Sequence, residues 1–137
     1  MIRLNPYIHF RGNAREAMEF YRSVFGGTLN VSTFSEFGMT DNPTEGGKIM
    51  HSQLEAANGL VFMASDTPSH MAYEPGNTIT MSLSGTDDAQ LLGYWDKLSA
   101  GATIDQPLQA SPWGDHFGML TDQYGIEWMV NITPQRT

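Results

Sequence analysis

The chain has 137 residues, with 15 Asp and Glu against 7 Lys and Arg for a net charge of −8, and it contains no cysteine. The missing thiols exclude disulfide frameworks, thiolate zinc sites and cysteine nucleophiles. The basic residues are scattered, so the composition predicts neither nucleic-acid binding nor attraction to an anionic membrane. No apolar run approaches the ~18 residues of a transmembrane helix and no signal-peptide pattern opens the chain, so we expect a cytoplasmic protein.

A strand of alternating character is predicted over residues 4–10. Asn5, Tyr7 and His9 lie on one face, and the residues between them, mostly apolar, lie on the other, against the helix that follows. The first face is too polar for a sealed core, so we expect it to line a wet cavity.

A helix is predicted over residues 13–25. Asn13 and Glu16 form a capping-box pattern at its start, and Gly26-Gly27 end it. The residues between carry one apolar stripe at helical spacing. The stripe consists of Ala14, Ala17, Met18, Tyr21, Val24 and Phe25.

The rest of the first half predicts four further segments. In order they are a β-rich stretch (28–35), a Gly- and Pro-rich loop (37–48), a hairpin (49–55 with 60–65) and a linker (66–77). The hairpin turns at Asn58-Gly59, a pair typical of tight turns. The loop exceeds the usual connection length, which indicates either a lid or simple mobility.

The second half repeats the first. A strand with Thr78, Thr80 and Ser82 on one face and Ile79, Met81 and Leu83 on the other precedes a helix that starts at Asp87, with Gln90 three residues on. The helix has the apolar stripe Leu91, Tyr94, Trp95 and Leu98 and ends by Gly101. After it come a short β segment (102–104), a loop (106–115) and a hairpin (117–121 with 126–132).

Residues 59–65 match residues 125–131 at an offset of 66. We therefore expect two βαβββ modules, residues 1–66 and 77–133, in one domain spanning residues 1–137. Each module alone is too small to bury both faces of its sheet, so the two sheets are expected to enclose a common cavity.

Several motifs carry a family resemblance. They are Leu4-Asn5-Pro6-Tyr7, Gly12-Asn13 to Phe20-Tyr21 with Gly26-Gly27, Ile49-Met50-His51, Met63-Ala64-Ser65-Asp66, Trp113-Gly114 with Phe117-Gly118-Met119, and Thr121-Asp122 to Asn131. In this order they resemble the PhnB-like branch of the vicinal oxygen chelate superfamily, the glyoxalase, bleomycin-resistance and dioxygenase group. The resemblance implies an α+β fold in which two tandem βαβββ modules form a cupped mixed sheet, and a homodimer.

Some relatives bear a ubiquinone-methyltransferase label. The sequence has no glycine-rich strand-to-helix turn that could hold a nucleoside cofactor, so we give this label little weight.

The resemblance also places the metal ligands of the superfamily on four positions. These fall on Asn5, Val61, Thr78 and Glu127, of which only Glu127 is a credible ligand. Because a divalent transition metal needs about three His or carboxylate donors, we expect no classical metal centre, no cofactor and no glyoxalase I activity.

Three side chains are candidates for acid–base chemistry. Glu127 stands beside Trp128, and burial by the indole would raise the pKa of the carboxyl and suit it to act as a general base. His9 and His51 are its candidate partners. The alternatives are a carboxylate satisfied by a hydroxyl, structural histidines, or an atypical metal set made by His51, His116 and Glu127.

A ligand-binding surface is predicted from two groups of residues. An apolar wall would come from Trp113, Phe117, Met63, Met119 and Met129, and polar contacts from Asn5, Tyr7, Thr78 and Thr80. Ordinary core packing is the alternative for the methionines.

Three functions remain open at this stage. The first is metal-free binding of a small apolar or aromatic metabolite, the second an isomerase or lyase that uses Glu127 with a histidine, and the third a structural dimer.

Overall fold

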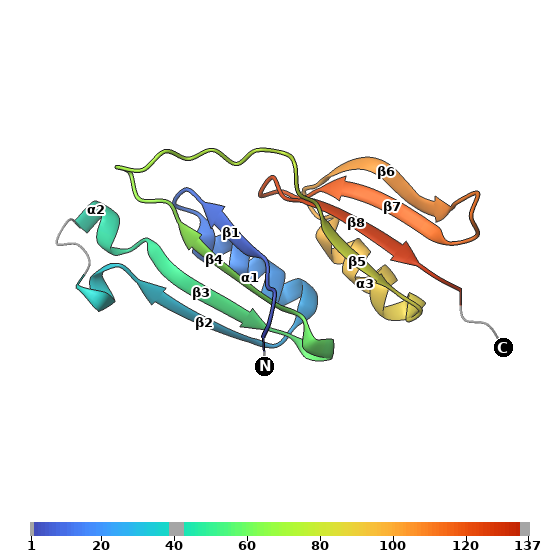
Figure 1. Cartoon of the computed structure of the whole chain (residues 1–137), viewed down its shortest axis with the longest axis horizontal. Coiled ribbons are helices and arrows are strands. Elements are labelled where there is room, and N and C mark those ends of the chain that lie inside the picture. Colours follow the sequence, from blue (N-terminus) through green and yellow to red (C-terminus); the bar gives the residue numbers. More distant parts are fainter. Residues whose placement is uncertain (1, 39–42, 135–137) are drawn as a thin grey trace. The chain divides into compact units, whose positions relative to one another are not determined.

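The computed structural model describes residues 2–38 and 43–134. The chain divides into two compact units between Pro75 and Gly76. Within each unit one long helix packs on one face of a four-stranded mixed sheet (Figure 1).

The first unit contains a sheet with the strand order β1-β4-β3-β2. Its main elements are β1 (Tyr7–Phe10), α1 (Ala14–Phe25), β2 (Thr28–Thr33), β3 (Ile49–Glu55) and β4 (Val61–Asp66). Its short helical turns are η1 (Ser35–Phe37), α2 (Pro43–Gly46) and η2 (Ala57–Gly59). Strands β1 and β4 are parallel, and the other neighbouring pairs are antiparallel.

The second unit repeats this arrangement with the order β5-β8-β7-β6. Its elements are β5 (Met81–Gly85), α3 (Asp88–Leu98), β6 (Thr103–Ala110), β7 (His116–Thr121) and β8 (Glu127–Ile132). The parallel pair is again formed by the first and last strands of the unit. The predicted α+β fold of two βαβββ modules is therefore confirmed.

Both predicted helices bury their predicted apolar stripes. In α1 the buried residues are Ala14, Ala17, Met18, Tyr21, Val24 and Phe25; in α3 they are Leu91, Tyr94, Trp95 and Leu98. Phe62 on β4 receives the edges of two α1 rings, with centroids 5.5 Å from Tyr21 and 5.9 Å from Phe25. Helical periodicity thus identified the core face of each helix correctly.

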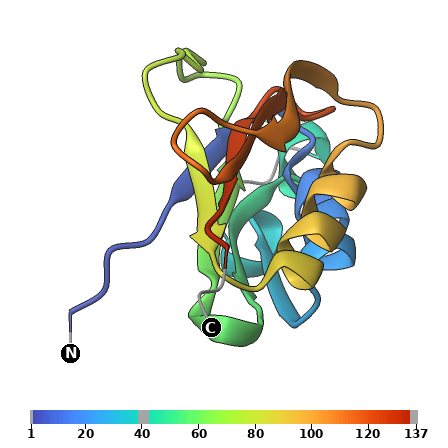
Figure 2. The same cartoon turned by 90° about the vertical axis from the view of Figure 1, so that its right-hand side faces the viewer.

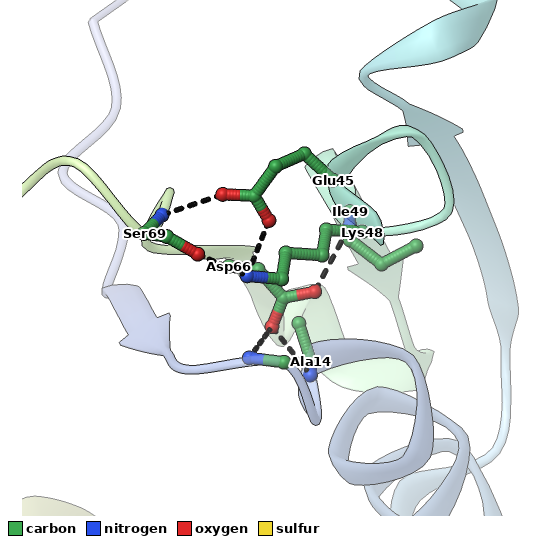
Figure 3. Close-up of polar contacts among 7 residues, drawn as sticks. Ala14, Glu45, Lys48, Ile49, Asp66 and Ser69 are labelled. Atoms are coloured by element: carbon green, nitrogen blue, oxygen red, sulfur yellow. Dashed lines mark hydrogen bonds and ion pairs between the residues drawn. The ribbon is translucent and has the colours of Figure 1, made fainter. Parts of the chain in front are cut away.

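The two helix starts differ in how they are capped. In α3 the prediction is confirmed, because the Asp87 carboxylate accepts a hydrogen bond from the Gln90 amide at 3.1 Å. In α1 the predicted cap is wrong, because the Asn13 side chain makes no capping bond. Oδ1 of Asp66 instead accepts from the amides of Gly12 at 2.8 Å and Ala14 at 2.9 Å (Figure 3).

Asp66 therefore corrects the predicted linker. It is the last residue of β4 and is buried, so the connection to the second unit begins after it. Its Oδ2 also accepts a hydrogen bond from the Ile49 amide at 2.9 Å, so one carboxylate joins α1, β3 and β4. Three backbone amides satisfy this buried charge.

The first strand of each unit is shorter than predicted. Leu4 and Ile79 lie before β1 and β5, and 99% and 81% of their surfaces are exposed. In Figure 2 the segment that precedes β1 is extended and points away from the sheet of the first unit. Alternation of apolar and polar residues continues past the end of the pairing, so it could not mark where each strand begins.

The predicted loop over 106–115 is partly wrong, because β6 continues to Ala110. Pro107 is tolerated there because β6 is an edge strand. The pairing of β6 with β7 shifts register on both sides of Gln106. In the other predicted loop, 37–48, the structure has α2; residues 39–42 of that prediction lie outside the described residues.

Both predicted hairpins are confirmed to within one residue at each strand end. In the second hairpin, Gly118 permits a close approach of layers. A Cβ at this position would lie 2.8 Å from both Leu108 Cα and the Trp95 ring. The glycine is thus needed for packing of β7 against α3.

Candidate functional site

The face of each sheet opposite its helix, here called the far face, holds most of the predicted site residues. Side chains alternate along a strand, so the register decides which of them share this face. In the first unit one cross-strand row consists of His9, Ser65, His51 and Ser32, and the next consists of Tyr7, Met63, Gln53 and Asn30.

Three ring side chains of the first far face form a cluster. The ring centroid of Tyr7 lies 5.2 Å from that of His9 and 5.9 Å from that of His51. The Tyr7 hydroxyl is 3.4 Å from Nδ1 of His51. Tyr7 and His9 are exposed and His51 is half-buried, so the cluster presents hydrogen-bonding groups at the surface of its sheet.

The second far face is more apolar. Met119 pairs with Met129, and Phe117 in the same strand pairs with Asn131. Trp113 approaches Phe117 edge-on with ring centroids 5.8 Å apart, although 62% of the Trp113 surface is exposed. An exposed indole beside a phenyl ring and two thioethers is an arrangement suited to contact with an apolar ligand.

A hydrogen-bonded turn holds Trp113 in this position. Both the backbone amide and the hydroxyl of Ser111 donate to the Asp115 carbonyl oxygen at 2.7 Å. The Asp115 carboxylate in turn accepts from Asn131 Nδ2 at 2.8 Å, which ties the turn to β8.

Glu127 lies at the start of β8 on the same far face. The Thr80 hydroxyl donates to its Oε2 at 3.3 Å, and Thr121 is its cross-strand partner. The expectation that Trp128 buries this carboxylate is wrong, because successive strand residues point to opposite faces. The Trp128 indole lies on the helix side and donates to Asp122 Oδ2 at 2.8 Å.

The register also changes which threonine accompanies Glu127. Met81 pairs with Trp128, so the residue before Met81, Thr80, stands beside Glu127, and Thr78 lies further from it. Thr78 is exposed, and Asn5 is half-buried ahead of β1. Val61 holds in the first unit the position that Glu127 holds in the second.

No metal set is assembled within residues 2–38 and 43–134, where no three His, Asp or Glu side chains are grouped. His116 pairs with Ile132, at the opposite end of the β7–β8 hairpin from Glu127. The alternative of an atypical metal set made by His51, His116 and Glu127 is therefore wrong in bringing His116 and Glu127 together.

The sequence patterns did not indicate the structural importance of the buried acids Asp66 and Asp122. Asp122 accepts the amides of Tyr124 and Ile126 with Oδ1, at 2.8 and 3.1 Å, and the Trp128 indole with Oδ2. Both carboxylates hold elements of their own units together. For Asp66 no local pattern could reveal this role, because two of its three amide donors lie more than 50 residues away.

One carboxylate has a displaced pKa. The Lys48 ammonium, 2.5 Å from Glu45 Oε2, together with hydrogen bonding by Ser69, lowers the pKa of Glu45 from 4.5 to about 2. The Ser69 amide donates to Oε1 at 2.7 Å (Figure 3). This ion pair fastens residue 69, in the connection between the units, to α2.

The fold of two βαβββ modules is the one seen in the glyoxalase, bleomycin-resistance and dioxygenase superfamily. A family enzyme of that description from Burkholderia phytofirmans shares the fold, with a TM-score of 0.58 at 12% identity over 92% of this chain and 95% of that one. Residues 3–131 match the model of the 3-demethylubiquinone-9 3-methyltransferase family. The chain belongs to this family, which includes the PhnB-like proteins.

Three relatives illustrate the likeness. Protein YjdN of Escherichia coli K12 is 26% identical over 97% of both chains. The structure of PA1353 from Pseudomonas aeruginosa matches with a TM-score of 0.86 and 32% identity over 98% of this chain and all of that one. A Bacillus cereus structure described as a putative 3-demethylubiquinone-9 3-methyltransferase, PhnB protein, matches with a TM-score of 0.74 and 25% identity over 96% and 100%.

Among the described residues, none of the helices is both long and apolar enough to span a membrane.

Proposed function

We propose that the chain binds a compact aromatic or apolar small molecule on the far face of its second unit, without a metal ion. The observation that carries the proposal is the exposed Trp113 ring held against Phe117, beside the paired Met119 and Met129. A soluble protein gains nothing in stability from leaving an indole exposed at such a fixed place, whereas a ligand that covers it gains apolar contact.

Polar groups at both ends of this surface would orient the ligand. Glu127 with Thr80 stands at one end and Asn131 with Asp115 at the other. An apolar wall between a few fixed hydrogen-bonding groups is the usual composition of a small-molecule site. Binding of this kind needs no metal. The homodimer and the cytoplasmic location stay predictions.

A second candidate is isomerase- or lyase-type acid–base chemistry by Glu127. It is supported by the half-buried position of this carboxylate beside the apolar surface, where the Thr80 hydroxyl donates a long hydrogen bond to it. Such a carboxylate can both receive and return a proton of a bound ligand. Glu127→Gln would then abolish turnover of a substrate while leaving its affinity largely unchanged.

The binding proposal is tested by a thermal-shift screen of aromatic compounds, because a ligand that binds only the native state raises the melting temperature. Hits are retested by titration against Phe117→Ala and the matched control Leu92→Ala, an exposed apolar residue on α3. We expect Phe117→Ala to weaken binding at least about tenfold, a loss of about 1.4 kcal/mol, and Leu92→Ala to leave it unchanged. A screen without hits, or hits indifferent to Phe117→Ala, would overturn the proposal.

A further inference from the structure

The ring cluster of the first far face, Tyr7, His9 and His51, is not used by the function proposed above. It belongs to the other unit and contains hydrogen-bonding rings rather than thioethers. We propose that this cluster binds a small planar carboxylate, and that protonation of His51 opens the site by freeing the Tyr7 hydroxyl to donate to the ligand.

The contact between Tyr7 and His51 reverses direction when the imidazole gains a proton. Their heavy atoms, the phenolic oxygen and Nδ1, are 3.4 Å apart. A neutral imidazole with unprotonated Nδ1 accepts the phenolic hydrogen, whereas an imidazolium is a donor at both nitrogens. The Tyr7 oxygen then accepts from His51, and its own hydrogen becomes available to another acceptor.

The freed hydrogen has an outward path. Tyr7 is 41% exposed, so its hydroxyl hydrogen can reach a ligand at the surface of the sheet. His9, which is exposed and has its ring centroid 5.2 Å from that of Tyr7, supplies a second imidazole whose protonation adds positive charge at the same place. A carboxylate is the matching acceptor because charge-assisted hydrogen bonds are the stronger kind.

The charges around the cluster favour this response. On the far face, β1 contributes Tyr7 and His9, β3 contributes His51 and Glu55, and the positions of β2 and β4 are uncharged. Glu55 is two rows from His51 and accepts a hydrogen bond from Gln53 Nε2 at 2.6 Å. No carboxylate therefore shares the row of His51.

Charged residues beyond the strand ends complete the surroundings. Arg11 follows β1, and Lys48, just before β3, is ion-paired with Glu45. In a chain with a net charge of −8, a row of side chains without a carboxylate repels an anion less than its surroundings do, and it attracts one once its imidazoles are charged.

The experiment measures benzoate affinity by NMR titration at about pH 8 and about pH 5.5, which bracket imidazole protonation. Benzamide, of the same shape but neutral, is the control ligand. We expect benzoate to bind at least about tenfold more tightly at the lower pH, and benzamide affinity to stay constant.

Two variants separate this site from general electrostatics. Tyr7→Phe keeps the ring contacts and removes the hydroxyl, and His51→Gln removes the titration; each should abolish most of the rise in benzoate affinity. His70→Gln, which alters an exposed histidine outside the sheet, should keep it. Circular dichroism and melting curves confirm that the variants are folded.

A rise that persists in Tyr7→Phe or His51→Gln would overturn the proposal, as would benzamide binding that follows the same pH dependence. A ligand-free readout adds a second test. The imidazole nitrogen shifts of His51 at about pH 8 should change in Tyr7→Phe, because Nδ1 loses its donor; unchanged shifts would contradict the contact. Failure here leaves the binding at Trp113 and Phe117 untouched, since that site lies in the other unit.

Discussion

Oδ1 of Asp66 lies 2.9 Å from the backbone amide of Ala14, a residue 52 positions earlier in the chain. With the Gly12 amide on the same oxygen and the Ile49 amide on Oδ2, the carboxylate closes the start of α1 against β3 and β4. A single buried charge that accepts from three backbone amides therefore holds this part of the first unit together.

Asp66→Ala should lower the free energy of unfolding of the first unit by roughly 2 to 5 kcal/mol, because it leaves three backbone amides without their acceptor. Asp66→Asn, which keeps one acceptor oxygen, should lose less. Asn13→Ala is the matched control and should cost under about 0.5 kcal/mol, since Asn13 does not cap α1. Urea denaturation followed by circular dichroism measures all three; equal losses for Asn13→Ala and Asp66→Ala would contradict the assignment.

The groups that cap α1 and α3 show what the sequence could and could not predict. Helix positions, apolar stripes and both hairpins follow from periodicity and turn residues, which are local. Asp87 was identified as a cap because its partner, Gln90, is three residues away. Asp66 was assigned to a linker because its partners become neighbours only after the strands have paired.

Two glycines of the second unit should respond oppositely to alanine. Gly93 lies inside α3 with nothing within 4 Å of an added Cβ, so Gly93→Ala should raise the free energy of unfolding by about 0.5 to 1 kcal/mol. Gly118→Ala should lower it by roughly 1 to 3 kcal/mol, because the Cβ would overlap Leu108 and the Trp95 ring. Urea midpoints measure both; a Gly118→Ala variant of unchanged stability would show that β7 does not pack this closely against Leu108 and Trp95.

The ion pair of Glu45 and Lys48 should make the stability of the folded protein depend on pH in the acidic range. The pKa of Glu45 is lowered from 4.5 to about 2, so its folded-state carboxylate contributes stability above pH 4.5 that is lost as the pH falls toward about 2. At neutral pH the melting temperature of the wild type should be higher than that of Glu45→Gln. This difference in melting temperature should shrink as the pH falls from 4.5 toward about 2.

Added salt should reduce the difference in melting temperature between wild type and Glu45→Gln at neutral pH, because the ion pair is partly exposed. Glu74→Gln, an exposed carboxylate in the same connection, is the control and should show no such pH-dependent gap. A difference between wild type and Glu45→Gln that stays constant from neutral pH to about pH 2 would contradict the role given to the ion pair.

For the candidate site, the sequence predicted which residues share one face of a strand, but not which residues of different strands the register brings together. Alternation along residues 4–10 correctly placed Tyr7 and His9 on one face, and the apolar wall of Phe117, Met119 and Met129 also follows from a period of two. The contact of Tyr7 with His51 depends on the register through β4, which no local pattern encodes. Trp128 was wrongly placed against Glu127 because chain neighbours in a strand are not neighbours in space.

The same register predicts how the protein responds to divalent metals. Thr80 stands beside Glu127, and Asn5 and Val61 hold the corresponding positions of the first unit, so one carboxylate is present where about three strong donors are needed. Dialysis against EDTA should therefore leave the melting temperature unchanged, and adding Mn²⁺, Ni²⁺ or Zn²⁺ should shift wild type and Glu127→Gln by equal amounts. A metal-induced rise present in wild type and absent from Glu127→Gln would show that Glu127 holds an ion together with other donors, and would contradict this prediction. Elemental analysis of the purified protein checks the same point without added metal, since a site that mattered for folding would retain near-stoichiometric metal.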